Sequence, residues 1–284
     1  MQRRWFRFVA GRLVLYLAVA YLTIGLYFYF EQAKFLFPAP KDFDKVTPAA
    51  AGLAFDDLRI PVGAKGYLHG WHIPSQTGAQ GMILVFHGNG YVLDSVGEEE
   101  AVDLHRIGPG LLLVDYRGYG LSTAVVPNEA TIQEDADASL RYLVSDLAIA
   151  PERVFVMGRS IGSGPATYLA ARTPGLGGLV LATPFTSIAD AAADSLYFRL
   201  YPIDLMLHTH FDNLSRIASV HAPVLIVGGT SDTLTPPWMA RRIFARANDP
   251  KQIYFVPGAG HNNLLTVGGR ELVQVLQRFT GMKN

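Results

Sequence analysis

The feature that most constrains the fold of this chain is the segment "RVFVMGRSIGSGPATYLAA", residues 153–171. An apolar, β-branched run ends there at a Gly-x-Ser-x-Gly cluster, and an alanine-rich segment typical of a helix follows at once. A strand that enters a helix in this way must turn sharply, and Ser160 then stands at the strained apex. Glycine is expected at 158 and 162 because side chains there would collide with the neighbouring backbone. The segment therefore predicts a serine hydroxyl presented above the edge of a sheet, as a nucleophile would be.

The rest of the chain repeats this alternation of short apolar runs and helical segments. Strands are predicted at 56–62, 66–74, 82–86, 111–114, 154–157, 178–183, 224–227 and 253–256. Helices are predicted at 95–107, 131–147, 160–172, 236–247 and 269–279, with Thr131 and Glu134 as a capping box for the second. This pattern predicts an α/β fold with a mainly parallel, doubly wound sheet after a starting hairpin. The long mixed stretch at about 184–219 is predicted to be a small cap insertion.

The N-terminus predicts one transmembrane helix. Residues 13–30 carry no charge, whereas Arg3, Arg4, Arg7 and Arg12 precede them. At about 1.5 Å per residue the run reaches about 27 Å, close to the hydrocarbon thickness of a bilayer. The positive-inside rule then places the N-terminus in the cytoplasm and the rest of the chain on the extracytoplasmic side, periplasmic or luminal. We therefore expect a membrane anchor at 1–37 and a catalytic domain at 38–284.

Two other interpretations of the apolar run were weighed. The sequence Ala18-Val19-Ala20 has the small-x-small form of a signal-peptide cleavage site, but a cut there would leave an apolar region that is too short. A core helix that packs on a domain keeps a polar stripe, whereas this run is apolar on every face. An uncleaved anchor is the interpretation that fits both observations.

Composition excludes several classes of function. The chain has 24 basic and 24 acidic residues, so nothing in its charge favours nucleic-acid binding. It contains no cysteine, which excludes disulfides, a thiol nucleophile, cysteine-ligated zinc and cysteine acylation. His208 and His210 could suggest a metal pair, but no acidic or cysteine cluster accompanies them. We expect neither a metal nor a cofactor.

A serine nucleophile needs a base, and the base needs an acid that orients it. Reactive groups of a parallel sheet gather at the carboxyl ends of its strands, and the expected chain order is Ser, Asp, His. Asp232 follows the strand 224–227, and His261 follows the last strand. Ser160, Asp232 and His261 are therefore the predicted catalytic triad.

The tetrahedral intermediate of such a reaction also needs two backbone N–H donors. The amide of Ile161, which follows the nucleophile, is expected to supply one. The other is expected from Asn89 in the loop "HGNG" that follows the strand 82–86. His87 is interpreted as a residue that ties this loop together rather than as a second base.

With these motifs in place, the chain resembles the α/β-hydrolase superfamily, and most of all its membrane-anchored "alpha/beta-hydrolase domain" serine hydrolases, relatives of serine aminopeptidase-like and acylglycerol-lipase-like proteins. The matching pieces are "HGNG", "DYRGYGLS", "GRSIGSG", "GGTSDTLTP" and "GAGHNN", which occur in this order between residues 81 and 264. The resemblance implies the same triad and the same two backbone donors. Some depalmitoylating members carry an N-terminal cysteine cluster for lipid attachment, and this chain departs from them because it has none.

The predicted cap suggests the substrate. Its apolar residues could line an acyl pocket, which favours a lipid-like acyl ester or thioester as the substrate. A peptidase with the same triad would need a carboxylate that recognises an amine, and Asp190 and Asp194 are the candidates. A third reading is a membrane-tethered interaction module without catalysis, against which the intact Ser, Asp and His argue. The oligomeric state is left open.

Overall fold

The computed structural model describes residues 2–40, 46–75, 78, 81–193 and 198–281. Its strands are β1 (Asp56–Val62), β2 (Gly66–Ile73), β3 (Met82–Phe86), β4 (Gly110–Val114), β5 (Val154–Arg159), β6 (Gly178–Ala182), β7 (Val224–Gly229) and β8 (Lys251–Val256). Its helices are α1 (Gln2–Leu36), α2 (Leu93–His105), α3 (Glu129–Arg141), α4 (Ser163–Arg172), α5 (Ile188–Ala193), α6 (Ile203–Met206), α7 (Asn213–Arg216), α8 (Pro237–Arg246) and α9 (Leu264–Phe279).

The strands form one sheet in the order β1-β2-β4-β3-β5-β6-β7-β8 within the described part of the chain. β1 and β2 form the expected antiparallel hairpin, and β2 also lies antiparallel to β4. All later neighbours are parallel. The chain therefore has the mainly parallel sheet that the alternation of strands and helices predicts.

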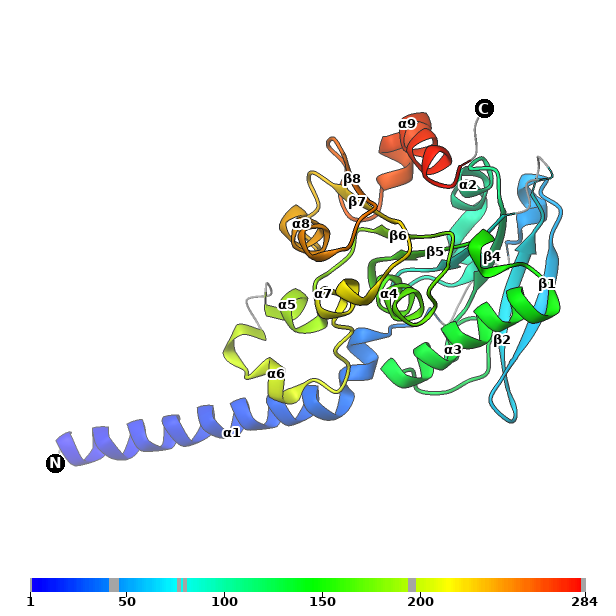
Figure 1. Ribbon diagram of the computed structural model, residues 1–284. Coiled ribbons are helices and arrows are strands. Elements are labelled where there is room, and N and C mark those ends of the chain that lie inside the picture. The colour runs from blue at the N-terminus through cyan, green and yellow to red at the C-terminus, as the bar shows by residue number, and fades with distance from the viewer. Residues whose placement is uncertain (1, 41–45, 76–77, 79–80, 194–197, 282–284) are drawn as a thin grey trace.

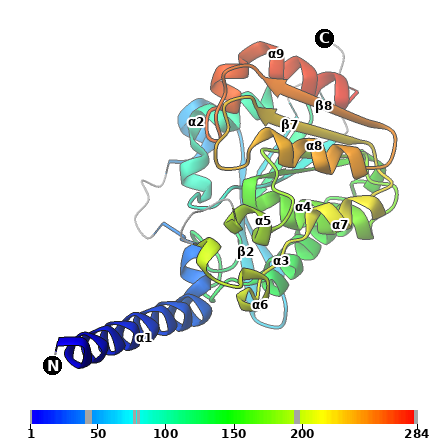
Figure 2. The same ribbon diagram turned by 90° about the vertical axis from the view of Figure 1, so that its left-hand side faces the viewer.

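The sheet is covered by helices on both faces (Figures 1 and 2). Alternate residues of β3 show why its sequence is apolar throughout: Leu84 belongs to the core under α3, α4 and α8, whereas Ile83 and Val85 belong to the core under α2 and α9. Each central strand is buried on both faces, as in a doubly wound sheet. This confirms the predicted fold class.

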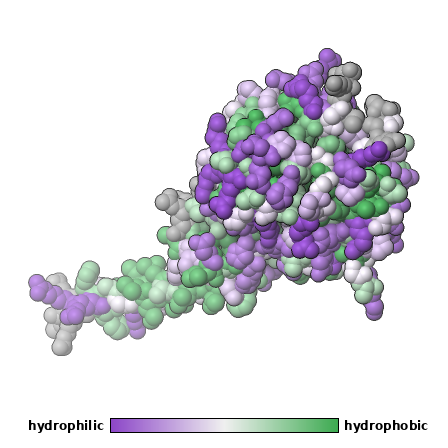
Figure 3. All heavy atoms as spheres, viewed as in Figure 1, coloured by the Kyte–Doolittle hydropathy of each residue, from purple (hydrophilic) through white to green (hydrophobic). Residues whose placement is uncertain are grey.

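Helix α1 extends from this domain as a single rod (Figure 1). Its 35 residues correspond to about 52 Å at about 1.5 Å per residue. Residues 5–36 are long and apolar enough to cross a membrane, and most of their large apolar side chains are exposed. Figure 3 shows apolar side chains gathered along the rod, with polar residues at its N-terminal tip. The N-terminal helix is thus a candidate membrane span.

Several helix boundaries differ from the prediction: α4 begins at Ser163 instead of 160, α9 begins at Leu264 instead of 269, and α3 ends at Arg141 instead of 147. The start of α3 also differs, for a reason that the structure shows. Helix α3 begins at Glu129, with Asn128 as its N-cap: the Asn128 side chain accepts from the Thr131 amide (3.0 Å), and Thr131 Oγ1 accepts from the Asn128 amide (2.9 Å). Glu134 accepts instead from the Arg117 guanidinium (2.7 Å). Thr131 is thus the third residue of the helix rather than its cap, because the asparagine before it already satisfies the free amides of the first turn.

Candidate active site

Ser160 lies on the turn between β5 and α4. Its φ of +51° is left-handed, a conformation that costs energy for a residue with a side chain. A Cβ atom at Gly158 would collide with the Gly162 carbonyl, and one at Gly162 would collide with the Phe86 carbonyl at the end of β3. Both positions therefore require glycine, and the turn holds the serine side chain clear of the sheet.

The structure brings the three predicted triad residues together from three strand ends. Ser160 Oγ lies 2.9 Å from His261 Nε2, and His261 Nδ1 lies 2.9 Å from Asp232 Oδ2. Only 10% of the His261 side chain and 1% of the Asp232 side chain are exposed. The imidazole therefore stands between a hydroxyl and a buried carboxylate, as the base of an activated serine must.

Asp232 is held by more hydrogen bonds than the one from the imidazole. Its Oδ1 accepts from the amides of Leu234 and Thr235 (both 2.9 Å), and its Oδ2 accepts from Thr235 Oγ1 (2.8 Å). Burial opposes ionisation of this carboxyl group, but the hydrogen bonds from His261 and Thr235 outweigh it and hold the pKa of Asp232 below its ordinary value. Asp232 is thus an anion that keeps the Nδ1 proton of His261 in place.

Thr235 is a site residue that the sequence reasoning missed. Besides its bond to Asp232, its Oγ1 lies 3.2 Å from the Thr183 carbonyl and 3.1 Å from His261 Nδ1. The sequence offers one signal for it: Thr235 lies three residues after Asp232 in a proline-rich loop. Side chains at this spacing commonly close such a turn through a hydrogen bond.

The loop after β3 lies against the nucleophile turn. A Cβ atom placed on Gly88 would lie 3.7 Å from Ser160 Cβ, so the backbone that leads to Asn89 runs beside the serine. The Asn89 side chain accepts a hydrogen bond from Tyr119 Oη (3.2 Å). Ile161, the other residue expected to supply a donor, directly follows Ser160 and is buried. Ile161 therefore adjoins the serine in the chain, and Asn89 adjoins Gly88, whose backbone lies beside the serine.

A buried cluster supports this loop from behind. His87 Nδ1 donates to the Gly88 carbonyl (2.8 Å), and Tyr116 Oη donates to the His87 carbonyl (3.0 Å). Asp115 lies 3.4 Å from His87 Nε2 and 3.5 Å from His69 Nδ1. Burial opposes ionisation of Asp115, but the two imidazoles outweigh it, so the pKa of Asp115 lies below its ordinary value. His87 thus links the loop to the end of β4, and its ring nitrogens contact Gly88 and Asp115 rather than Ser160. This is the structural role expected for it.

Residues 183–223, between β6 and β7, form an excursion that leaves the carboxyl end of β6 and returns to the sheet at β7. Two backbone hydrogen bonds close the excursion, from the Ile188 amide to the His210 carbonyl and from the Leu214 amide to the Thr186 carbonyl (both 2.9 Å). At its base, the Asn213 amide group donates to Ser163 Oγ (2.9 Å), which in turn donates to the Ser160 carbonyl (2.6 Å). This excursion is therefore tied to the nucleophile turn.

Among the remaining candidates, the described residues Asp190 and His208 have partners outside the triad. Asp190, whose side chain is 38% exposed, accepts from Thr186 Oγ1 and faces Arg242 (3.7 Å), so its carboxylate already has two partners from the protein. Asp194 lies outside the described residues. The His208 ring packs on Tyr29 (4.5 Å between centroids). Among the described residues no group of three or more His, Asp or Glu side chains could hold a metal ion.

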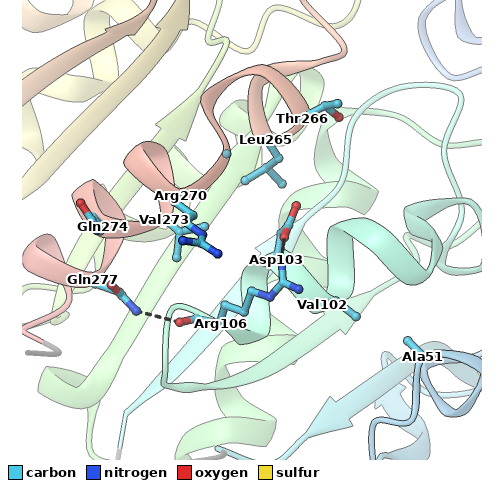
Figure 4. A pocket seen from close by; sticks show the side chains of 11 residues that line it. Ala51, Val102, Asp103, Arg106, Leu265, Thr266, Arg270, Val273, Gln274 and Gln277 are labelled. Atoms are coloured by element: carbon cyan, nitrogen blue, oxygen red, sulfur yellow. Dashed lines mark hydrogen bonds and ion pairs between the residues drawn. The ribbon is translucent and has the colours of Figure 1, made fainter. Parts of the chain in front are cut away.

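A hollow of about 840 Å³ lies between α2 and α9 (Figure 4). Arg106 forms an ion pair with Asp103 there (2.7 Å), and the Gln277 amide donates to the Arg106 carbonyl (2.9 Å). None of the triad residues lines this hollow. It is therefore a separate feature of the surface.

Comparisons with known proteins agree with this architecture. A family model described as serine aminopeptidase, S33, matches residues 77–204. An uncharacterized protein of Mycobacterium tuberculosis is 38% identical over 213 residues, which cover 75% of this chain and 74% of the relative. Alpha/beta hydrolase domain-containing protein 17B of Homo sapiens is 30% identical over 201 residues, covering 71% of this chain and 66% of the relative.

Solved structures share the fold at lower identity. The Pyrococcus furiosus esterase Pf2001 superposes with a TM-score of 0.72 at 19% identity, over 86% of this chain and 96% of that one. The acylaminoacyl peptidase of Pyrococcus horikoshii superposes with a TM-score of 0.64 at 16% identity, over 81% of this chain and 41% of that one. Together with the sequence relatives and the sheet topology, these matches show that the chain belongs to the α/β-hydrolase superfamily.

Proposed function

We propose that this hydrolase is a membrane-anchored serine hydrolase that cleaves carboxylic esters or thioesters with acyl, lipid-like groups. The observation that carries the proposal is the continuous row of contacts at 2.9 Å from Ser160 Oγ through the His261 imidazole to Asp232 Oδ2. A histidine so placed can accept the hydroxyl proton at Nε2 while the buried carboxylate stabilises the imidazolium that forms.

The reaction follows from these roles. Ser160 Oγ attacks the carbonyl carbon of the substrate and gives its proton to His261 Nε2. The negative charge on the carbonyl oxygen is stabilised by the amides of Asn89 and Ile161, which act as the oxyanion hole. As the tetrahedral intermediate collapses, His261 returns the proton to the departing alcohol or thiol and an acyl-enzyme remains. Water, deprotonated by the same histidine, then releases the carboxylic acid and restores the serine.

The chain is proposed to act at a membrane surface. Residues 1–37 would anchor it, with the span at about 13–30, and residues 38–284 would form the catalytic domain. The arginines before the span favour a cytoplasmic N-terminus and an extracytoplasmic catalytic domain. A reporter enzyme fused after Phe30 tests this orientation: activity outside the cytoplasm is expected, and activity inside it would reverse the topology.

Residues 184–219 would form the cap over the site. Among the apolar residues of this segment that could line an acyl pocket, Phe198, Leu200, Ile203, Leu205 and Met206 are on short helices, whereas Leu196 and Tyr197 lie outside the described residues. An apolar cap beside a membrane helix favours an acyl group over a charged peptide.

A peptidase activity is the second candidate, favoured by the family model described as serine aminopeptidase. The engaged carboxylate of Asp190 argues against it, because an amine-recognising group must be free to meet the substrate.

A series of p-nitrophenyl esters from acetyl to decanoyl, assayed beside aminoacyl p-nitroanilides, separates the two activities. We expect hydrolysis of the esters with kcat/KM rising with chain length, and loss of this activity in Ser160→Ala. Faster cleavage of the anilides would make the chain a peptidase and overturn the proposal.

A further inference from the structure

One face of α1 is docked on the segment 198–208. Tyr21, Gly25, Phe28 and Gln32 recur at the spacing of successive helical turns, and each contacts this segment. The Tyr21 ring stacks on Tyr201, with centroids 4.5 Å apart and planes 7° from parallel. The anchor helix is therefore packed against the cap as well as joined to the domain through the chain (Figures 1 and 2).

The polar groups of this contact are paired with one another. Tyr21 Oη donates to the Leu200 carbonyl (2.7 Å), and Tyr201 Oη donates to the Tyr21 carbonyl (3.1 Å). The Gln32 side chain donates to the Met206 carbonyl (3.1 Å) and accepts from the His208 amide (2.7 Å). Such pairing is what a low-dielectric surrounding demands, because a polar group left unpaired there costs several kcal/mol.

Between α1 and the cap lies a cavity of about 200 Å³. Its walls are apolar side chains from three elements: Phe28 and Phe35 of α1, Ile188 and Ala192 of α5, and Ile203 and Met206 of α6. Gln32 also lines it, but protein partners occupy both ends of its amide. At about 30 Å³ for each group the size of a water molecule, the cavity has room for roughly six such groups. It therefore suits part of a hydrocarbon chain and not a polar headgroup.

We propose that this cavity binds the acyl chain of a bilayer lipid, and that the anchor helix is one wall of the binding site. As a statement about the substrate, this rests on the proposed esterase or thioesterase function. As a statement about binding, it stands on the apolar walls and on α1, the candidate membrane span that supplies one of them.

The surroundings of the cavity favour a chain that enters from the membrane. Leu200 and Leu205 are 72% and 83% exposed beside α1, whose outward face is itself apolar. Water would disfavour this continuous apolar surface, whereas the outer leaflet would cover it. The exposed carboxylate of Asp204 on α6 holds this part of the cap at the level of the interface rather than at the bilayer centre.

The segment that carries α5, one wall of the cavity, is linked through hydrogen bonds to the turn that holds Ser160. Helix α5 begins two residues after Thr186, where the excursion of the cap opens. Asn213, at the closing end, donates to both the Phe185 carbonyl (3.0 Å) and Ser163 Oγ, and Ser163 Oγ donates to the Ser160 carbonyl. A chain held between α1 and α5 is thus bound to the part of the protein that positions Ser160.

Photo-crosslinking tests the binding directly. Full-length Ser160→Ala protein in phosphatidylcholine nanodiscs is supplied with a phosphatidylcholine that carries a diazirine in one acyl chain. We expect crosslinks on the α5 peptide, and at least a fivefold reduction when Ala192→Phe fills the cavity. Ala193→Phe is the matched control, since Ala193 is on the same helix but exposed and outside the cavity wall. Equal crosslinking in the two variants, or none on α5, would overturn the proposal.

A second pair of variants changes α1, the wall of the cavity opposite α5. It keeps the proposal testable if Ala192→Phe does not fold. A Cβ atom at Gly25 would lie 2.9 Å from the Tyr201 ring, whereas one at Gly11 meets nothing within 4 Å. Gly25→Leu should push the cap off α1 and reduce the α5 crosslinks at least fivefold, and Gly11→Leu should leave them at the wild-type level. Unchanged crosslinking in Gly25→Leu would show that α1 is not a wall of the site.

Activity measurements separate the two proposals. In the serine-containing protein, the ratio of kcat/KM for decanoyl to acetyl p-nitrophenyl ester should fall at least fivefold in Ala192→Phe and stay unchanged in Ala193→Phe. If the crosslinks behave as expected but no ester is hydrolysed, the cavity is an acyl site and the proposed function is wrong. If wild type hydrolyses esters but Ala192→Phe changes neither the decanoyl-to-acetyl ratio nor the crosslinks, the proposed function stands and the proposed acyl-binding cavity is wrong.

Discussion

Replacing Asp232 by asparagine should trap His261 in the wrong tautomer. Oδ1 of Asp232 accepts from two backbone amides, so the oxygen of an asparagine must take that position and its NH₂ group must take the position of Oδ2. There the NH₂ faces His261 Nδ1, which lies 2.9 Å from Oδ2. A donor at this place requires Nδ1 to accept, so the imidazole proton moves to Nε2. Nε2 can then no longer take the proton of Ser160.

The expected cost is large for catalysis and small for folding. Misplacing the proton of a triad histidine lowers kcat by about 10⁴, which is about 5.5 kcal/mol in the activation free energy. The side-chain volume is nearly unchanged and both backbone amides keep their acceptor, so the free energy of unfolding should fall by less than about 2 kcal/mol. Stopped-flow and steady-state hydrolysis of a p-nitrophenyl ester, with a thermal melt in the same detergent, measure the two quantities.

Asp190→Asn is the matched control, because it makes the same chemical change at a carboxylate of the cap. Its ester hydrolysis should remain within about threefold of wild type. The reasoning is refuted if Asp232→Asn retains more than about a tenth of wild-type kcat while its melting temperature is unchanged.

Three further changes probe the supports of the site. Gly158→Ala places a methyl group against the Gly162 carbonyl. It should lower the free energy of unfolding by about 2–3 kcal/mol, measured by thermal melt, and reduce labelling by a fluorophosphonate, measured by gel fluorescence. A variant that is as stable as wild type and labels normally would contradict the requirement for glycine in this turn. Glu129→Gln should destabilise the fold by about 1–2 kcal/mol, because Glu129 accepts from two amides and an arginine of the returning cap segment. Burial opposes ionisation of Glu129, but these bonds outweigh it and lower the pKa of Glu129 below 4.5. The stability that the ionised carboxylate contributes is therefore present above that pH and is lost as the pH falls through the lowered pKa. The difference in melting temperature between wild type and variant should be smaller at pH 3 than at pH 7, and an equal difference at both would show that the charge of Glu129 is not the reason. Tyr119→Phe removes the hydrogen bond to the Asn89 side chain. If Asn89 supplies an oxyanion-hole donor, kcat should fall about three- to tenfold with little change in KM, and a change confined to KM would show that Tyr119 does not position the loop that carries Asn89.

Much of the site follows from the positions of residues relative to strand ends. The side chains of Ser160, Asp232 and His261 are far apart in sequence, but each follows an apolar run that the pattern predicts to be a parallel strand. Because the carboxyl ends of parallel strands meet at one edge, their order along the chain was enough to predict that they converge. The glycines at 158 and 162 could be predicted for the same reason, since the turn leaves no space for side chains.

The features that were missed depend on contacts between segments that carry no periodic signal. Thr235 joins the site through one hydroxyl in a loop, and its partners Thr183 and His261 come from other strand ends. The docking of α1 on the segment 198–208 depends on Gly25 and Tyr21, which in an apolar helix look like any other residues of a membrane span. The predicted start of α3 was wrong by two residues. A threonine can be the N-cap itself or the third helical residue that bonds to the N-cap, and Thr131 takes the second role because Asn128 is the N-cap.

The central claim is that Ser160 attacks the substrate and is acylated. Intact-protein mass spectrometry after treatment with a fluorophosphonate, followed by peptide mapping, tests this claim most directly. We expect one adduct on the peptide that contains Ser160, and none in the folded Ser160→Ala variant. An adduct on another residue, or an equal adduct in Ser160→Ala, would contradict it.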